Sequence, residues 1–243
     1  MVLRLGLGWT GVRELTNHVV KPSDYLDDRT GVRSIGYAGA VDFQSSLFAD
    51  EAAAAPALAP ERRVLSRGAW VDVQRNWLPD PDAAFTALVE RVPWRAERRE
   101  MYDAVVDVPR LVHTYLAGDP LPHAALDRAR ADLSAHYLPE LGEPFVTAGC
   151  CYYRDGRDSV AWHGDTIGRG RAEDTMVAIV SVGDPRRLLL RPRGGGPSIA
   201  LTMGHGDLVV MGGTCQRSWE HAVPKVAHSG PRISVQFRPL NVF

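Results

Sequence analysis

The segment from Tyr152 to Asp165 carries the residue pattern with the clearest chemical meaning. It reads YYRDGRDSVAWHGD and ends in His163-Gly164-Asp165. Side chains two positions apart on an extended strand point to the same face, so the imidazole of His163 and the carboxylate of Asp165 can bind one metal ion. With a second, distant histidine they would form a facial triad of two histidines and one carboxylate. Such a triad leaves iron positions open for a co-substrate and for oxygen.

The C-terminal segment from Trp219 to Arg238 supplies further residues of this kind. It reads WEHAVPKVAHSGPRISVQFR and places a histidine ahead of a strand that carries Arg232 and Arg238, six residues apart. Because strand side chains alternate, both arginines face the same side. Charged residues inside a barrel are costly unless they are paired, and a co-substrate with a carboxylate at each end would pair both. The alternative is that both arginines form surface ion pairs at a rim.

The elements that would position these residues begin after a poorly organised N-terminal segment. Residues 1–60 show no clear period and end in AAAAPALAP, so we expect a loosely ordered arm followed by one domain over residues 61–243. Asp80 and Pro81 predict a helix start, with Asp80 as the N-cap. Apolar residues then recur at helical spacing until Pro93. A second helix is expected from about Pro122 to Leu138.

The remainder of the chain has the character of a β-rich domain. Strand-like residues with a glycine break occupy Val64 to Gln74, and after Gly142 short runs alternate with turn residues. We expect strands over Val146 to Tyr153, Thr175 to Val182, Arg187 to Arg191, Ser198 to Thr202, Asp207 to Met211 and Arg232 to Phe237. Helices first and many strands later predicts an α+β fold with a mainly β core, an antiparallel barrel or jelly roll with the N-terminal helices packed outside.

Composition limits the classes of function. The formal net charge of −1, from 28 Lys+Arg and 29 Asp+Glu, excludes a strong overall basic field for polyanions. Three cysteines, two of them adjacent, argue against a disulfide framework and favour a reducing compartment. The N-terminus has no apolar run of signal-peptide or membrane-spanning length. We therefore expect a cytoplasmic monomer that is not bound to a membrane.

Taken together, these motifs resemble the AlkB family of iron- and 2-oxoglutarate-dependent dioxygenases, which repair alkylated nucleic-acid bases. The similar blocks agree in order and spacing and are VDVPRL, YRDGRDSVAWHGD, GHGDLVVMGG, WEHAVPK and PRISVQFR. The resemblance implies a double-stranded β-helix with iron inside one mouth of the barrel. It also implies Fe(II), 2-oxoglutarate as co-substrate and O2 as the cofactor set.

Roles follow from the resemblance residue by residue. The iron ligands, which are also the catalytic set, would be His163, Asp165 and His221. His205, in a glycine-flanked turn, and His228, in a loop, compete for the distal position, but we expect both to be structural or solvent-facing. The co-substrate residues would be Tyr153, Arg232, Ser234 and Arg238, with Arg232 at the distal carboxylate and Arg238 at the end beside the iron.

This chain departs from the family pattern beside the co-substrate. The asparagine of the family's N-x-Y is Cys151 here, and the asparagine of its R-x-N-x-x-x-R strand is Ser234. Acids that follow the H-x-D in DNA-repairing members, where they meet the exocyclic amine of the damaged base, are replaced by Thr166 and Ile167. The iron chemistry should survive these changes, whereas the standard base readout should not.

The resemblance also predicts a substrate. Trp94, Tyr102 and Tyr115 lie where the family's substrate lid begins, and aromatic side chains there could stack on a flipped base, although core packing is the alternative. We expect oxidative dealkylation of alkylated bases in DNA or RNA. The same iron chemistry on a small molecule or a protein side chain is the alternative that Thr166, Ile167 and the near-neutral charge favour. A non-catalytic binding module would have no use for the ligand set and both arginines.

Overall fold

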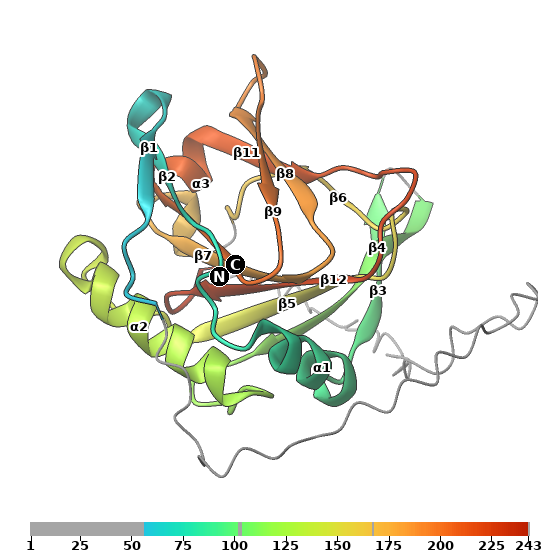
Figure 1. Ribbon diagram of the computed structural model, residues 1–243. Coiled ribbons are helices and arrows are strands. Elements are labelled where there is room, and N and C mark those ends of the chain that lie inside the picture. Colours follow the sequence, from blue (N-terminus) through green and yellow to red (C-terminus); the bar gives the residue numbers. More distant parts are fainter. Residues whose placement is uncertain (1–55, 102–103, 167, 243) are drawn as a thin grey trace, which may run out of the picture.

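The computed structural model describes residues 56–101, 104–166 and 168–242 of the chain. Its strands form two antiparallel sheets that face each other (Figure 1). The large sheet has eight strands in the order β1-β2-β10-β7-β12-β5-β4-β3, and the small sheet has four in the order β6-β11-β8-β9. This is the jelly-roll architecture that the order of elements in the sequence predicts.

The helices and strands have the following bounds. The large sheet contains β1 (Glu61–Val64), β2 (Ala69–Gln74), β3 (Arg95–Met101), β4 (Ala104–Tyr115), β5 (Thr147–Tyr153), β7 (Val177–Gly183), β10 (Asp207–Gly213) and β12 (Arg232–Arg238). The small sheet contains β6 (Val160–His163), β8 (Arg186–Pro192), β9 (Ile199–Met203) and β11 (Trp219–Val223). The helices are α1 (Pro81–Arg91), α2 (Ala124–Leu141), α3 (Cys215–Ser218) and the short 3-10 turns Ser66–Gly68 and Arg169–Arg171.

Two apolar clusters lie on opposite faces of the large sheet. Helices α1 and α2 cover its outer face (Figure 1), where Leu88, Leu126 and Leu133 pack against sheet residues such as Phe237. The second cluster fills the space between the sheets. Because strand side chains alternate, β5 and β12 send every other residue into the barrel and the rest towards the helices. This alternation decides which residues can reach a site in the barrel.

The helix ends differ from the sequence expectation at one cap. Helix α1 begins at Pro81 as predicted, but Asp80 has a left-handed backbone with φ 49° and its side chain caps nothing. Asp80 occupies the N-cap position as predicted, but its side chain makes no capping hydrogen bond, because a capping residue needs an extended backbone to reach the first amides. Helix α2 begins after His123, whose Nδ1 accepts from the amide of Ala125, and ends at Gly142 with φ 81°.

The hairpin of β3 and β4 is an element that the sequence expectation did not include. It forms the edge of the large sheet beside β5, with Leu111 opposite Tyr152 and Tyr115 opposite Ala148. The run RAERREM in β3 lacks an apolar alternation, and Pro109 interrupts β4, so neither strand is evident from pattern alone. The hairpin forms one wall of the site described below.

The N-terminal arm remains a prediction over most of its length, because residues 1–55 lie outside the described residues. Of the described part, Ala57 and Ala59 are bound to the side chain of Gln74, and β1 begins at Glu61. All three cysteines are free, as expected. None of the helices in the described part of the chain is both long and apolar enough to span a membrane.

Asp72 in β2 joins the helix layer to the sheet. It is buried and accepts two hydrogen bonds from Arg62 of β1, and the hydroxyl of Tyr137 in α2 donates to its Oδ2 at 2.9 Å. We expect Tyr137→Phe to destabilise the fold by about 1 kcal/mol and Asp72→Ala to cost more, because the latter leaves the Tyr137 hydroxyl unpaired. Thermal unfolding measures both. Glu140→Gln, which changes only the exposed partner of Arg62, is the control and should have little effect.

Candidate metal centre

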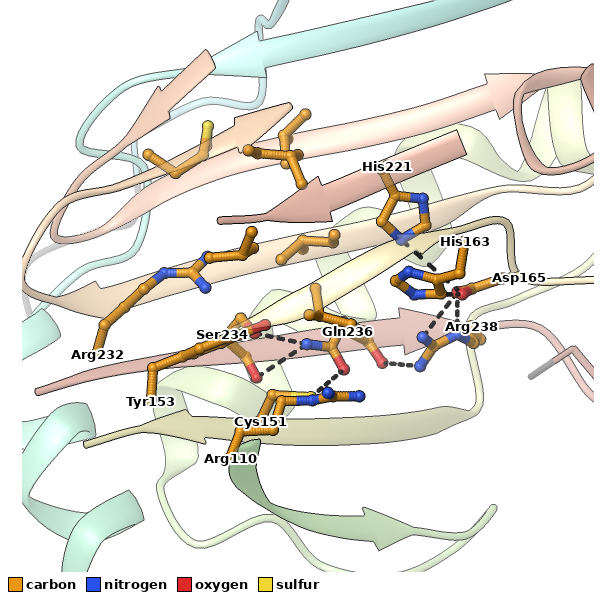
Figure 2. Close-up of a pocket in the computed structure, with 16 residues that line it drawn as sticks. Arg110, Cys151, Tyr153, His163, Asp165, His221, Arg232, Ser234, Gln236 and Arg238 are labelled. Carbon is orange, nitrogen blue, oxygen red and sulfur yellow. Dashed lines mark hydrogen bonds and ion pairs between the residues drawn. The ribbon is translucent and has the colours of Figure 1, made fainter. Parts of the chain in front are cut away.

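His163 and His221 meet because their strands are paired. They lie directly opposite each other on β6 and β11, with ring centroids 4.2 Å apart. Strand β6 ends at His163, and Asp165 follows two residues later in coil, so the H-x-D pattern lies only partly on a strand. Ligand atoms of His163, Asp165 and His221 all lie within 4.8 Å of one another (Figure 2). One ion could reach all three after small side-chain movements.

Gly164 is needed between the two ligands of the H-x-D. A Cβ built on it would come 2.5 Å from the carbonyl oxygen of Gln216, which is backbone and cannot easily move. The amide of Asp165 also donates to the side chain of Gln216 at 3.3 Å. The chain therefore runs against α3 at this point, and this close approach turns the Asp165 carboxylate towards the histidines.

The protonation states suit a metal. Burial would raise the pKa of Asp165, but Arg238 and the two histidines hold it well below its usual range, so the group is a carboxylate at neutral pH. Burial, with His163 nearby, lowers the pKa of His221 to about 3, which leaves this imidazole neutral. The Nδ1 of His163 lies 2.9 Å from the carbonyl of Ala161; because a carbonyl only accepts, Nε2 keeps its lone pair.

Arg238 holds the carboxylate ligand from the opposite sheet. Its Nε and Nη2 donate to Oδ2 of Asp165 at 3.0 and 2.8 Å, which leaves Oδ1 directed at the histidines. The side chain of Asp165 is 6% exposed and that of His221 is 10% exposed, whereas that of His163 is 39% exposed. The three ligands thus differ in their access to solvent.

An inner cavity of about 80 Å³ leads from the ligands into the barrel between the sheets. Arg232 lies at its far end and is 3% exposed. One of its nitrogens donates to the hydroxyl of Ser181 at 2.7 Å, while Nε and Nη1 are buried with no partner among the described residues. A buried guanidinium with unpaired donors is costly, so this end of the cavity is suited to an anion.

The neighbours of Arg232 also make this end of the cavity suited to an anion. The ring of Tyr153 lies 5.1 Å from its guanidinium, and Arg186 lies on the same ring at 5.6 Å. Burial raises the pKa of Tyr153, so its hydroxyl stays protonated. The ligand trio at one end and Arg232 at the other fit iron and a dicarboxylate. Tyr153, Arg232, Ser234 and Arg238 all line this cavity, and their roles towards a co-substrate stay predictions.

An outer cavity of about 450 Å³ opens on the other side of the ligands, over the β3–β4 hairpin. Arg95, Glu97, Arg110 and Val112 line it. Its wall is completed by a group of residues that also line the inner cavity: Cys151, His163, Asp165, Gln236, Arg238 and Arg110 itself. The metal ligands therefore stand between two cavities, one deep and one open.

Two of the expected substrate aromatics, Trp94 and Tyr115, are not among the residues that line these cavities. Trp94 is 1% exposed, and its indole nitrogen donates to the carbonyl of Leu88 in α1, so the prediction that it stacks on a base is wrong. Tyr115 packs against the same core, on the helix side of the sheet, and burial raises its pKa to about 12. Its position likewise contradicts the prediction. Tyr102 lies outside the described residues.

The two competing histidines are not near the ligands. His205 accepts from the amide of Gly183 through Nδ1, and His228 is exposed on a loop beside Gly230. Gln236, Arg110 and Cys151 are site residues that the sequence analysis did not assign. Gln236 could have been found from the alternation that placed Arg232, Ser234 and Arg238 on one face.

Comparisons with known proteins agree with this geometry. A family model described as the 2OG-Fe(II) oxygenase superfamily matches residues 111–238. The chain is 30% identical over 185 residues to alpha-ketoglutarate-dependent dioxygenase alkB homolog 3 of Bos taurus, covering 66% of this chain and 62% of that protein. It is 33% identical over 130 residues to DNA oxidative demethylase ALKBH2 of Arabidopsis thaliana, covering 44% and 41%. The chain spans less than two thirds of the length of these relatives.

Structural similarity reaches further than sequence similarity. A prolyl hydroxylase from Trichoplax adhaerens, solved with a hypoxia inducible factor peptide, superposes with a TM-score of 0.51. It is 10% identical, and the match covers 69% of this chain and 83% of that chain. At this identity the likeness concerns the fold, a jelly-roll core.

Removing any one ligand should abolish tight metal binding without unfolding the protein. We expect His163→Ala, Asp165→Ala and His221→Ala each to weaken Mn(II) affinity by at least about a hundredfold, because loss of even an outer-shell partner costs 10- to 100-fold. Calorimetric titration measures the affinity, with His228→Ala as the control. Retained binding in His221→Ala, together with loss in His205→Ala or His228→Ala, would show that the distal ligand is misassigned.

Proposed function

Because the chain belongs to the 2OG-Fe(II) oxygenase superfamily and, within it, to the AlkB family, we propose that it is a dioxygenase that uses iron(II), 2-oxoglutarate and O2 to dealkylate alkylated nucleic-acid bases. The observation that carries this proposal is the buried, partly unpaired Arg232 at the end of a cavity that begins at His163, Asp165 and His221. The name of one relative, a DNA oxidative demethylase, supports the nucleic-acid substrate.

Each part of the inner cavity has a task in this reaction. When bound, iron(II) supplies the redox chemistry by which O2 converts 2-oxoglutarate to succinate and carbon dioxide and hydroxylates the N-alkyl carbon. Arg232 and the hydroxyl of Tyr153 bind the distal carboxylate through charge-assisted hydrogen bonds. Arg238 keeps Asp165 ionised and oriented. Burial of these groups excludes water and strengthens each contact.

The outer cavity is where we place the alkylated base. Arg95, Arg110 and Glu97 give it charged groups for a nucleotide, and it reaches His163 and Asp165 directly. Thr166, which stands where relatives carry an acid, turns its hydroxyl back towards the carbonyl of Gly164 at 3.5 Å. Glu97 and Asp165 are the carboxylates among the described residues that line this cavity. Base readout in this chain would therefore not rely on an acid at position 166.

The two arginines should be separable by experiment. We expect Arg232→Met to weaken 2-oxoglutarate affinity roughly ten- to a hundredfold while leaving metal affinity unchanged, because it removes only charge-assisted contacts to the far carboxylate. Arg238→Met should weaken metal affinity as well, since Asp165 loses the cation that keeps it ionised. Titrations of Mn(II) and of 2-oxoglutarate measure both effects. Arg187→Met, on an exposed strand position, is the control, and unchanged 2-oxoglutarate affinity in both variants would contradict the assignment.

The substrate assignment predicts demethylation with weak preference between bases. Short oligonucleotides that carry 1-methyladenine or 3-methylcytosine should be repaired at comparable rates, because a missing readout partner removes about 1–3 kcal/mol of discrimination. Affinity for the oligonucleotide should be modest. It should fall only weakly with rising salt concentration, because few arginines are available to contact phosphates. Coupled assays of succinate and of demethylated base at two salt concentrations measure this.

Two results would redirect the proposal. A sharp preference for one base would mean that another residue reads it, and Glu97→Gln would then test the carboxylate that lines the outer cavity. Robust succinate formation without conversion of either oligonucleotide would point to a small molecule or a protein side chain as the substrate. No conversion of 2-oxoglutarate at all would contradict the enzyme assignment.

A further inference from the structure

Gln236 lies where the two departures from the family pattern meet. In the pairing of β12 with β5, Ser234 stands opposite Cys151, and Gln236 stands opposite Gly149. The family pattern has an asparagine at both 151 and 234, so this chain lacks two amides beside the inner cavity. Gln236 is 8% exposed, lines both cavities and carries an amide between the two altered positions (Figure 2).

The amide of Gln236 contacts both altered residues. Its Nε2 donates to Oγ of Ser234 at 2.6 Å and to the carbonyl of the same residue at 3.2 Å. On its other side, the thiol of Cys151 donates to Oε1 at 3.8 Å, and the same sulfur accepts from Nε of Arg110 at 3.4 Å. One side chain thus joins the serine, which lines the inner cavity, to a cysteine and an arginine that line both cavities.

Gly149 makes the space for this side chain. A Cβ built on it would lie 3.1 Å from Oε1 of Gln236 and 2.8 Å from Nη1 of Arg238. Both neighbours are flexible side chains, so a methyl group would displace them rather than break the strand. The absence of a side chain at Gly149 therefore leaves the space that the long side chain of Gln236 occupies.

The contact with Ser234 fixes the direction of the hydroxyl groups along the cavity floor. Because Nε2 of Gln236 donates to Oγ of Ser234, the serine keeps its own proton to donate elsewhere. Tyr153 carries the next hydroxyl along the cavity; it stands opposite Arg232 in the pairing of β5 with β12, and its ring lies 5.1 Å from that guanidinium. A proton donated by Ser234 to the tyrosine oxygen would leave the tyrosine's own proton free for the cavity. The amide thereby arranges donors towards the end where Arg232 lacks partners.

We propose that Gln236 is a positioning residue for 2-oxoglutarate. Its single amide, in the space left by Gly149, takes the place beside the co-substrate of the two asparagines that the family pattern has at 151 and 234. This inference rests on the proposed function, because it concerns the same co-substrate. It assigns Gln236 to the orientation of Ser234 and Tyr153, and it leaves the metal to His163, Asp165 and His221.

The test is a titration of 2-oxoglutarate into the Mn(II)-loaded full chain, which requires no turnover. Gln236→Met keeps the length of the side chain and removes the amide, so affinity should fall about tenfold while Mn(II) affinity and thermal stability stay unchanged. Gly149→Ala should weaken affinity less. Gln74→Met is the matched control, since this glutamine binds only the backbone at Ala57 and Ala59, and it should behave as wild type.

Rescue separates positioning from a general packing role. Adding Cys151→Asn and Ser234→Asn to Gln236→Met should restore most of the lost affinity, because two amides then return to the cavity floor. Unchanged affinity in Gln236→Met, or a loss that the two asparagines do not recover, would overturn the inference. Failure of the wild-type protein to bind 2-oxoglutarate would overturn the proposed function as well, whereas wild-type binding with an unaffected Gln236→Met would overturn the inference alone.

Discussion

The ion pair between Arg238 and Asp165 is the interaction on which the site depends. Arg238 ends β12 in the middle of the large sheet, and Asp165 follows β6 at the edge of the small sheet, so the pair joins the two sheets at the mouth of the barrel. The carboxylate of Asp165 is buried, and without this partner its burial would cost on the order of several kcal/mol. Because β12 also carries Arg232, one strand orients both the carboxylate ligand and the far end of the inner cavity.

The two cavities would have different roles in the proposed reaction. The inner cavity is narrow, has apolar walls from both sheets and ends at a guanidinium that lacks partners. The outer cavity is larger and is walled by an edge hairpin. Under the proposed function, the enclosed side would hold the co-substrate in a fixed position, and the open side would admit a variable substrate. Gln236 lies at the boundary between these two regions.

Local sequence pattern predicted part of the candidate metal site but not the substrate side. Strand alternation, which acts locally, placed His163 with Asp165 and Arg232 with Arg238, whereas His221 was chosen over His205 and His228 from the family resemblance. Trp94 and Tyr115 were misplaced because an aromatic residue near a lid in sequence can face the core, and only packing against α1 and α2 decides which. The β3–β4 hairpin was not predicted, because its stability comes from pairing with β5 and not from the strand propensity of its own residues.

The unequal exposure of the ligands bears on how long a metal ion stays bound. His221 and Asp165 are shielded, whereas His163 is 39% exposed and ends a four-residue edge strand. Water, chelators and competing cations therefore reach the site from the His163 side, and fraying of β6 at the sheet edge detaches this ligand before the others. We therefore expect metal exchange to depend on the opening of this short strand rather than on the stability of the whole barrel. The enzyme's metal content should accordingly follow the ions available to it on the timescale of that local opening.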